Sequence, residues 1–387
     1  MSRTERRALG IGAGITLFVL MARLLGFGEG AALRSLDLLF WFRGPVQEQG
    51  VLAPVFIVAI DDESFDNMPE KWTWPRSYYG KIIRQIMKGK PKAIVFDMLF
   101  TEESSDARQD AEFAAACRQS GCVILGSELV TVVDKQYQKE ELKLPIKVLR
   151  NVIYSSGVVN TPKDADAYVR HAALIWKVHD ERHFSLALEA LRKYLGVGKG
   201  EINVENGLIE FGDRKIPVDQ NNHMLINFAG PAKTFRTIPF YQVFNGSFDA
   251  AVFKDAIVFV GSTAEVLHDT FETPFSWDLF GDQQVQSMPG IEIHANAIDT
   301  ILRNRFVSGM PGGMVPLLIL VLGLAISLVA IRARIWVAAL ATVTASAGVV
   351  ALSIWLFSSH ATFLEVVHPL GAILGAFLVC TVYRASV

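Results

Sequence analysis

Hydrophobic residues along the chain form short continuous runs that are separated by helical patterns. The short runs are rich in β-branched residues and lie at residues 55–60, 93–96, 123–125 and 256–260. Such runs are typical of strands covered on both faces, as in a parallel sheet. Apolar residues at helical spacing predict helices between them, at residues 78–87, 107–118, 184–195 and 289–302. This alternation predicts an α/β domain with a mainly parallel central sheet flanked by helices.

Residues 152–230 follow a different pattern, in which short strand-like segments alternate with turn signals. The strand-like segments lie at residues 152–159, 168–178, 208–211 and 224–228. Asn206-Gly207 is a strong signal for a tight hairpin turn between two of them. We therefore expect an antiparallel subregion inserted in the parallel core or flanking it.

Long apolar runs predict four transmembrane α-helices. They lie at residues 8–27, 315–331, 335–357 and 366–383, and each is long enough, or nearly so, to cross a bilayer. A cleaved secretory signal is disfavoured, because Leu20 and Arg23 make Ala22 a poor cleavage site. An amphipathic stretch at residues 31–42 is expected to seat the outer domain on the first helix. The predicted domains are residues 1–27, 28–310 and 311–387.

The basic residues near these helices all fall on one side if four helices span the membrane. They are Arg3, Arg6, Arg7, Arg332, Arg334 and Arg384. Because Lys and Arg are enriched in cytoplasmic segments, both termini are expected in the cytoplasm. Residues 28–310 are then extracytoplasmic, and the chain is a multi-pass membrane protein in contact with lipid.

Composition and net charge bear on one class of partner, nucleic acid. Half of the 387 residues are hydrophobic and the formal net charge is −2. Nucleic-acid-binding proteins normally show a basic face, and no basic patch interleaved with aromatic residues is present. The composition therefore argues against a nucleic acid as a partner.

Acidic side chains follow two of the predicted strands, where ligand crevices open in wound α/β sheets. Asp61 and Asp62 end the first strand, Asp97 ends the second, and Trp74 and Arg76 lie in the loop between them. These residues are ligand-binding candidates. Asp61, Asp62 and Asp97 are also candidates for a divalent cation, which prefers oxygen ligands. Capping of the following helices, and an internal ion pair of Arg76 with Asp61 or Asp97, are the structural alternatives.

A second group of polar residues follows the strand at residues 256–260. Ser262 and Thr263 form a turn that can cradle an anion or simply cap a helix, and His268, Asp269 and His294 are further ligand-binding candidates. A hydrolase built on Ser262 lacks the Gly-x-Ser-x-Gly elbow. An aspartyl phosphotransfer site at residues 61–63 lacks its second aspartate and a placed lysine. We therefore predict no catalytic residues and no cofactor.

Two small-xxx-small pairs predict close helix packing in the membrane. They are Gly10 with Gly14 and Gly371 with Gly375. Packing within one bundle and packing across a dimer remain equally open. Cys117 and Cys122 flank a short turn, where two buried thiols are favoured over a disulfide.

Several motifs occur together and in a fixed order. They are Asp37, Ile60-Asp61-Asp62-Glu63-Ser64, Trp74-Pro75-Arg76, Phe96-Asp97-Met98-Leu99-Phe100, Gly261-Ser262-Thr263, His268-Asp269, Thr273-Pro274 and Pro289-Gly290-Ile291-Glu292-Ile293-His294-Ala295-Asn296-Ala297. In these motifs the chain resembles the type-2 CHASE domain over roughly residues 30–305, together with the three membrane helices that usually follow it. The resemblance implies an extracellular sensory domain associated with bacterial cyclases, histidine kinases and Ser/Thr kinases. Together with the four predicted helices, it implies a location in the bacterial inner (plasma) membrane.

Three functions fit these observations. The leading hypothesis is a homodimeric receptor that binds an extracytoplasmic ligand or protein and signals through its membrane helices to a cytoplasmic effector. Because the chain stops at Val387, that effector is expected either in a longer protein or in a separate partner. The alternatives are a membrane-anchored extracytoplasmic hydrolase or phosphatase, and a structural subunit of an envelope assembly.

Overall fold

The computed structural model describes residues 3–46, 52–133, 138–276 and 286–386, and these form two compact units. One unit comprises Met1–Gly44 and Val307–Val387, and the other comprises Pro45–Phe306. We call them the helical unit and the α/β unit. Helix α2 (Glu29–Arg43), which the sequence analysis grouped with the outer domain, lies in the helical unit.

The α/β unit is built on a seven-stranded, mainly parallel sheet, as predicted. Its main strand order is β13-β1-β14-β2-β3-β4, and β5 pairs with β3. Only the β3–β4 pair is antiparallel. The strands are β1 (Val55–Ile60), β2 (Ala93–Leu99), β3 (Val123–Val133), β4 (Gln138–Lys143), β5 (Ser155–Val158), β13 (Arg236–Pro239) and β14 (Ile257–Ser262).

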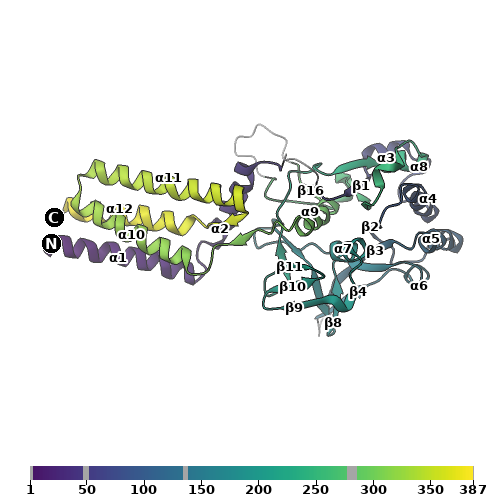
Figure 1. The fold of residues 1–387 in the computed structure, drawn as a ribbon, viewed down its shortest axis with the longest axis horizontal. Helices are drawn as coiled ribbons and strands as arrows, with labels where there is room; N and C mark the ends of the chain where they lie inside the picture. The colour runs from purple at the N-terminus through teal and green to yellow at the C-terminus, as the bar shows by residue number, and fades with distance from the viewer. Residues whose placement is uncertain (1–2, 47–51, 134–137, 277–285, 387) are drawn as a thin grey trace. The chain divides into compact units, whose positions relative to one another are not determined.

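Helices cover both faces of this sheet, which explains why its central strands are continuously apolar (Figure 1). Ile57 and Phe259 face a core shared with α7 and α9, whereas Val58 and Val260 face a core shared with α4, α5 and α8. All four side chains are fully buried. The helices of this unit are α3 (Asp62–Asn67), α4 (Arg76–Met87), α5 (Ala107–Ser120), α6 (Lys147–Arg150), α7 (Leu186–Leu195), α8 (Phe240–Asn245) and α9 (Gly290–Leu302).

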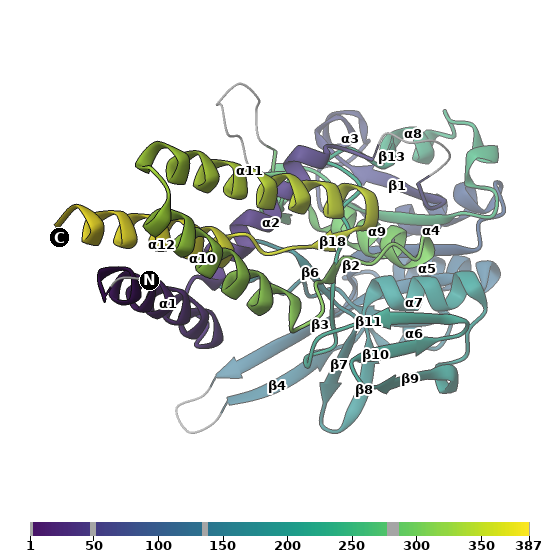
Figure 2. The ribbon, with the colours of Figure 1, turned by 60° about the vertical axis from the view of Figure 1, so that its left-hand side comes forward.

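The expected antiparallel subregion consists of small sheets beside the main one. Asn206 and Gly207 both adopt positive φ, and they join β9 to β10 in the predicted hairpin. Strands β3 and β4 form a long hairpin that extends from the sheet (Figure 2). The pairs and triplets are β6 (His171–Ala173) with β12 (His223–Leu225), β7 (Ile175–Val178) with β8 (Glu181–Phe184), β9 (Ile202–Glu205) with β10 (Leu208–Phe211) and β11 (Arg214–Pro217), and β15 (Thr270–Phe271) with β16 (Met288–Pro289).

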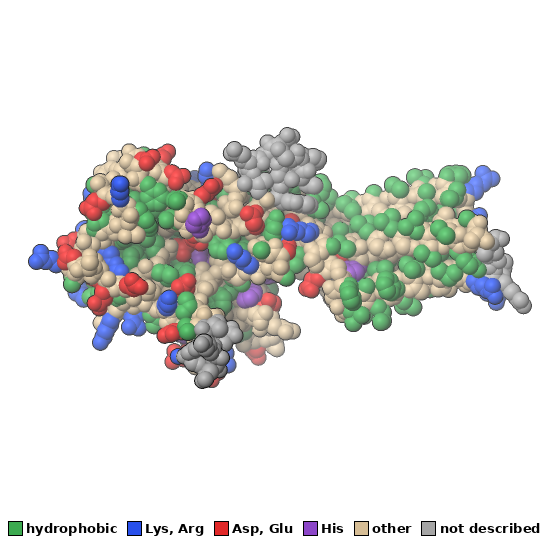
Figure 3. Space-filling model, turned by 180° about the vertical axis from the view of Figure 1, so that it is seen from behind, with side chains coloured by type: hydrophobic (Ala, Val, Ile, Leu, Met, Phe, Trp, Pro, Cys, Tyr) green, Lys and Arg blue, Asp and Glu red, His purple; other side chains and the backbone are tan. Residues whose placement is uncertain are grey.

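The helical unit contains four helices that are long and apolar enough to cross a membrane, as predicted. They are α1 (Arg3–Leu24), α10 (Met314–Arg332), α11 (Ile335–His360) and α12 (Val367–Ser386). Hydrophobic side chains cover the sides of this bundle (Figure 3), including Phe18, Leu317, Trp336 and Leu378, which are each more than half exposed. Strand β17 (Ser308–Gly309) pairs with β18 (Thr362–Phe363) within the same unit.

Close packing between the helices of the bundle involves Gly12 and Gly323, which were not predicted, and only some of the predicted glycines. A Cβ on Gly12 would lie 2.3 Å from Ser327 Oγ, and one on Gly323 would lie 2.4 Å from Thr16 Oγ1. Gly375 packs against Ile15 of α1, so this predicted glycine acts within the bundle. Gly371 is 4.0 Å from Val19, and Gly10 and Gly14 meet no described atom within 4 Å. All three cysteines are free and buried, which agrees with the favoured prediction of two thiols.

Candidate functional site

The acidic turn after β1 begins with a helix cap. Asp61 Oδ1 accepts hydrogen bonds from the Ser64 backbone N–H at 2.8 Å and from Ser64 Oγ at 2.6 Å. Asp61 is thus the N-cap of α3, the structural role that its position allowed. Asp62 and Glu63 follow in the first turn of α3, and both are exposed. Carboxylates are favoured there by the helix dipole.

Asp61 and Asp97 do not meet, because β14 lies between β1 and β2. Ala59, Gly261 and Asp97 occupy the same level of three neighbouring strands. The acidic residues at this edge of the sheet therefore divide between two cavities. We call them the acidic cavity and the small cavity.

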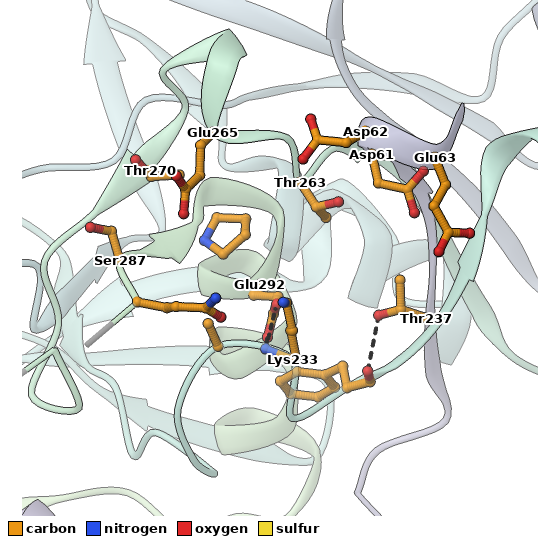
Figure 4. A pocket seen from close by; sticks show the side chains of 14 residues that line it. Asp61, Asp62, Glu63, Lys233, Thr237, Thr263, Glu265, Thr270, Ser287 and Glu292 are labelled. Atoms are coloured by element: carbon orange, nitrogen blue, oxygen red, sulfur yellow. Dashed lines mark hydrogen bonds between the residues drawn. The ribbon is translucent and has the colours of Figure 1, made fainter. Parts of the chain in front are cut away.

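The acidic cavity has a volume of about 640 Å³ and lies at the carboxyl ends of β1 and β14. Figure 4 shows Asp62, Thr263 and Glu265 along one side and Glu292 with Lys233 across from them. Its lining is formed by Asp61, Asp62, Glu63, Ala232, Lys233, Phe235, Thr237, Thr263, Glu265, Thr270, Gln286, Ser287, Pro289 and Glu292. Five of these residues carry carboxyl groups, and one carries an amine. The cavity is therefore strongly acidic.

Glu292 is the most enclosed of these acids, with a residue exposure of only 2%. It lies in the first turn of α9, and its two carboxylate oxygens accept the Lys233 backbone N–H at 2.8 and 2.9 Å. Burial raises the pKa of Glu292 to about 7, although backbone hydrogen bonds from Lys233 and Thr234 oppose the rise. The carboxyl group of Glu292 is therefore protonated and able to donate a hydrogen bond below about pH 7, and it is an anion above that pH.

The walls of the acidic cavity carry hydroxyl groups as well as acids. In the described ranges, no group of three or more His, Cys, Asp or Glu side chains is placed to hold a metal. A cavity of this size suits a small molecule, and four hydroxyl side chains add hydrogen-bonding groups. These are Thr237, Thr263, Thr270 and Ser287.

The small cavity, of about 200 Å³, brings together Asp97, Asp269 and His294. Burial raises the pKa of Asp97 to about 7. Burial, followed by the charge of Asp97, raises the pKa of Asp269 to about 6. Burial also lowers the pKa of His294 to about 4, so the imidazole is neutral at physiological pH.

Four predicted candidates line neither cavity. Trp74 is a core residue that stacks on Phe240 at 4.7 Å and is 4% exposed. Arg76 forms an ion pair with Asp110 at 2.5 Å. An internal ion pair of Arg76 is therefore present, but the partner of Arg76 is neither Asp61 nor Asp97.

The other two are Ser262 and His268. The Ser262 hydroxyl is buried and has no hydrogen-bond partner among the described residues, so no Ser–His pair of a hydrolase is formed. His268 is exposed and ends the 3-10 helix at Glu265–Leu267 with a left-handed conformation.

Sequence reasoning missed Lys233, Glu265 and Glu292 as site residues. Glu292 carried a usable signal, because it is an acid flanked by Ile291 and Ile293 in a mainly apolar helix. Lys233 and Glu265 carried none, since each is an ordinary charged residue in a polar loop.

Comparison with known protein families identifies the chain. The family model of the CHASE2 domain matches residues 14–331, a range that contains both cavities. The chain belongs to the CHASE2 domain family. CHASE2 domains are membrane-associated extracellular sensor modules of signalling proteins, and no catalytic domain is identified beside this one. No curated protein and no solved structure shows significant similarity to the chain.

Proposed function

We propose that this CHASE2 protein is a membrane receptor whose α/β unit binds a small organic cation from the extracytoplasmic side. Binding shifts the unit between two conformations, and the change passes through the membrane helices to a cytoplasmic effector of the cyclase or kinase type. A ligand shifts such an equilibrium only by its difference in affinity for the two states. We further propose that two copies act together as a homodimer.

The observation that carries this proposal is the acidic cavity. Five carboxyl groups and one amine line a volume of about 640 Å³, beside the buried ring of Phe235. The charge excess attracts a cation, and the hydroxyl and apolar groups of the wall distinguish an organic molecule from an inorganic ion.

The chain itself provides a route from the cavity toward the membrane helices. Glu292 belongs to α9, which ends at Leu302, and the helical unit resumes at Val307 after a short connection. A ligand that contacts Glu292 acts on the last helix of the α/β unit, which is followed along the chain by β17 and then α10. Displacement of α9 is therefore the transmission step that we propose.

The orientation rests on the arginines. Arg384 donates a hydrogen bond from Nη1 to the Ala330 carbonyl at 3.2 Å, so the end of α12 lies beside the turn that carries Arg332 and Arg334. Ala8 of α1 packs in the same cluster as Ala330 and Cys380. The basic residues thus gather at one end of the bundle, which supports placing that end in the cytoplasm.

Thermal unfolding of the full chain in detergent tests the proposal. Putrescine, a diamine, should raise the midpoint, whereas its neutral analogue 1,4-butanediol and the dianion succinate should not. Ligand at 100 times its dissociation constant adds about 2.7 kcal/mol. Glu265→Gln should weaken the putrescine effect, and Glu112→Gln, which alters an exposed acid of α5, should not. Equal shifts with diamine and diol, or no shift with any organic cation, would contradict it.

A further inference from the structure

Two carboxyl groups line the small cavity. Asp97 lies in β2, two residues before the strand ends at Leu99, and Asp269 follows the 3-10 helix at Glu265–Leu267. Among the described residues, none donates a hydrogen bond to either carboxylate. The remaining lining residues are uncharged, namely Met98, Leu99, Val159, Thr161 and Gly290. Two anions in one partly buried cavity oppose each other's ionisation, which favours the uptake of a proton by one of them.

His294 does not supply the missing positive charge. It is 6% exposed, and its ring donates a hydrogen bond to the Val159 carbonyl and lies parallel to Phe259, with centroids 6.4 Å apart. Glu292 faces the acidic cavity from the same helix, His268 is exposed, and the Lys163 amine lies over the Phe271 ring, 5.1 Å from its centroid. None of these three side chains lines the small cavity.

Asp97 and Asp269 both have raised pKa values, in neighbouring ranges. Burial raises the pKa of Asp97 to about 7 and that of Asp269 to about 6, and the second carboxyl responds to the charge of the first. Coupled carboxyls lose their protons in steps that belong to the pair. The pair thus binds a proton within the neutral range.

The two cavities share walls at two places. Asp269 lines the small cavity, and the next residue, Thr270, lines the acidic one. In the first turns of α9, Glu292 faces the acidic cavity and His294 the small one.

The two shared walls are also fixed to one another. Thr270 pairs with Pro289, and the Gly290 N–H donates to the Asp269 carbonyl at 3.0 Å. A Cβ on Gly290 would lie 2.8 Å from Asp269 Oδ1, so the carboxylate rests directly on the start of α9. A change at Asp269 is therefore transmitted to α9.

We propose that the small cavity is a proton-binding site, formed by Asp97 and Asp269, that regulates the acidic cavity through the start of α9. The regulatory part rests on the function proposed above, whereas the proton site does not. When the pair loses its proton, it adds negative charge beside the acidic cavity, and organic cations bind there more tightly. When the medium acidifies, the pair becomes neutral and cation binding weakens.

Infrared spectroscopy of the full chain tests the proton site without any ligand. The measurement uses Glu292→Gln, because Glu292 itself titrates in the same range. We expect the carboxylic acid C=O band to disappear between about pH 6 and about pH 7.5, and Asp97→Asn with Asp269→Asn to abolish this titration. Asp255→Asn, an exposed aspartate that lines neither cavity, should leave it intact. Absence of a titrating acid band in Glu292→Gln would overturn the proton site, whether or not the double variant folds.

Calorimetric titration with putrescine tests the regulation. From about pH 5.5 to about pH 8, the affinity of the unaltered chain should rise about fivefold more than that of the Asp97→Asn, Asp269→Asn chain, the lower end of typical coupling between sites. Equal pH dependence in the two chains would overturn the regulation while leaving the proton site standing. Failure of putrescine to bind at any pH would instead contradict the proposed function, and with it the regulation.

Discussion

Replacing Glu292 with glutamine should make the protein more stable at neutral and alkaline pH, although it alters a buried, hydrogen-bonded residue. The glutamine carbonyl can still accept the Lys233 N–H, as Glu292 does at 2.8 Å. The substitution removes the free-energy cost of ionising a carboxyl group in a residue that is only 2% exposed.

The magnitude follows from the pKa, which burial raises from 4.5 to about 7. A carboxyl with a raised folded-state pKa imposes no penalty below its unfolded pKa, and the penalty grows until the pH passes the folded value. At about 1.4 kcal/mol per unit, the full penalty is about 3 kcal/mol. Glu292→Gln should therefore match the unaltered chain near pH 4 and exceed its stability by about that amount near pH 8.

Thermal unfolding of the full chain in detergent, followed by tryptophan fluorescence at both pH values, measures this difference. At about 2–4 °C per kcal/mol for a large domain, the midpoint near pH 8 should rise by roughly 6–12 °C. Glu112→Gln, at an exposed position of α5, controls for the general effect of removing a charge. A midpoint difference that does not change with pH, or a less stable Glu292→Gln chain at pH 8, would refute the reasoning.

Two other substitutions test the packing. Arg76→Ala leaves the Asp110 carboxylate, in a residue that is 5% exposed, without its cation, and should lower the free energy of unfolding by about 3 kcal/mol in a denaturant titration. It should not change the affinity for putrescine, since Arg76 lines neither cavity. Gly12→Ile should disrupt the contact of α1 with Ser327 and lower the thermal midpoint of the purified chain, whereas Gly10→Ile, which meets open space, should leave that midpoint unchanged.

Much of the fold follows from local patterns in the sequence. The run at residues 55–60 is β1, the run at residues 256–260 is contained almost entirely in β14, and the hairpin at Asn206-Gly207 forms as expected. All four apolar helices were also predicted. These features depend on residue types within a few positions of one another, and neighbouring residues are what periodicity and turn chemistry report.

The site was harder to predict because it depends on strand order. Asp61 follows β1 and Asp97 lies near the end of β2, the next strand along the chain, yet β14 lies between these strands and the two residues line different cavities. The insertion pairs residues about 160–200 positions apart, which no local pattern encodes. Lys233 and Glu292 also lie far from Asp61 in the sequence, and the fold brings them to the same acidic cavity.

The helix-packing glycines show a related limit. The spacing of Gly10 and Gly14 is correct for a close contact, but the structure uses Gly12 of the same helix. The spacing shows that one face of a helix carries small residues, whereas the partner helix determines which face packs against it. The face of α1 that packs in the bundle could therefore not be predicted from the spacing of its glycines.

The most direct test of the central claim, a sensor unit held outside the cytoplasm, is thiol labelling of intact cells. Single cysteines at exposed Lys254 in the α/β unit and at exposed Arg332 in the α10–α11 turn serve as reporters, because the native cysteines are buried. With the outer membrane permeabilised, a reagent that cannot cross the inner membrane should label Lys254→Cys and spare Arg332→Cys until the cells are lysed. Labelling of Arg332→Cys in intact cells, with Lys254→Cys protected, would contradict the account.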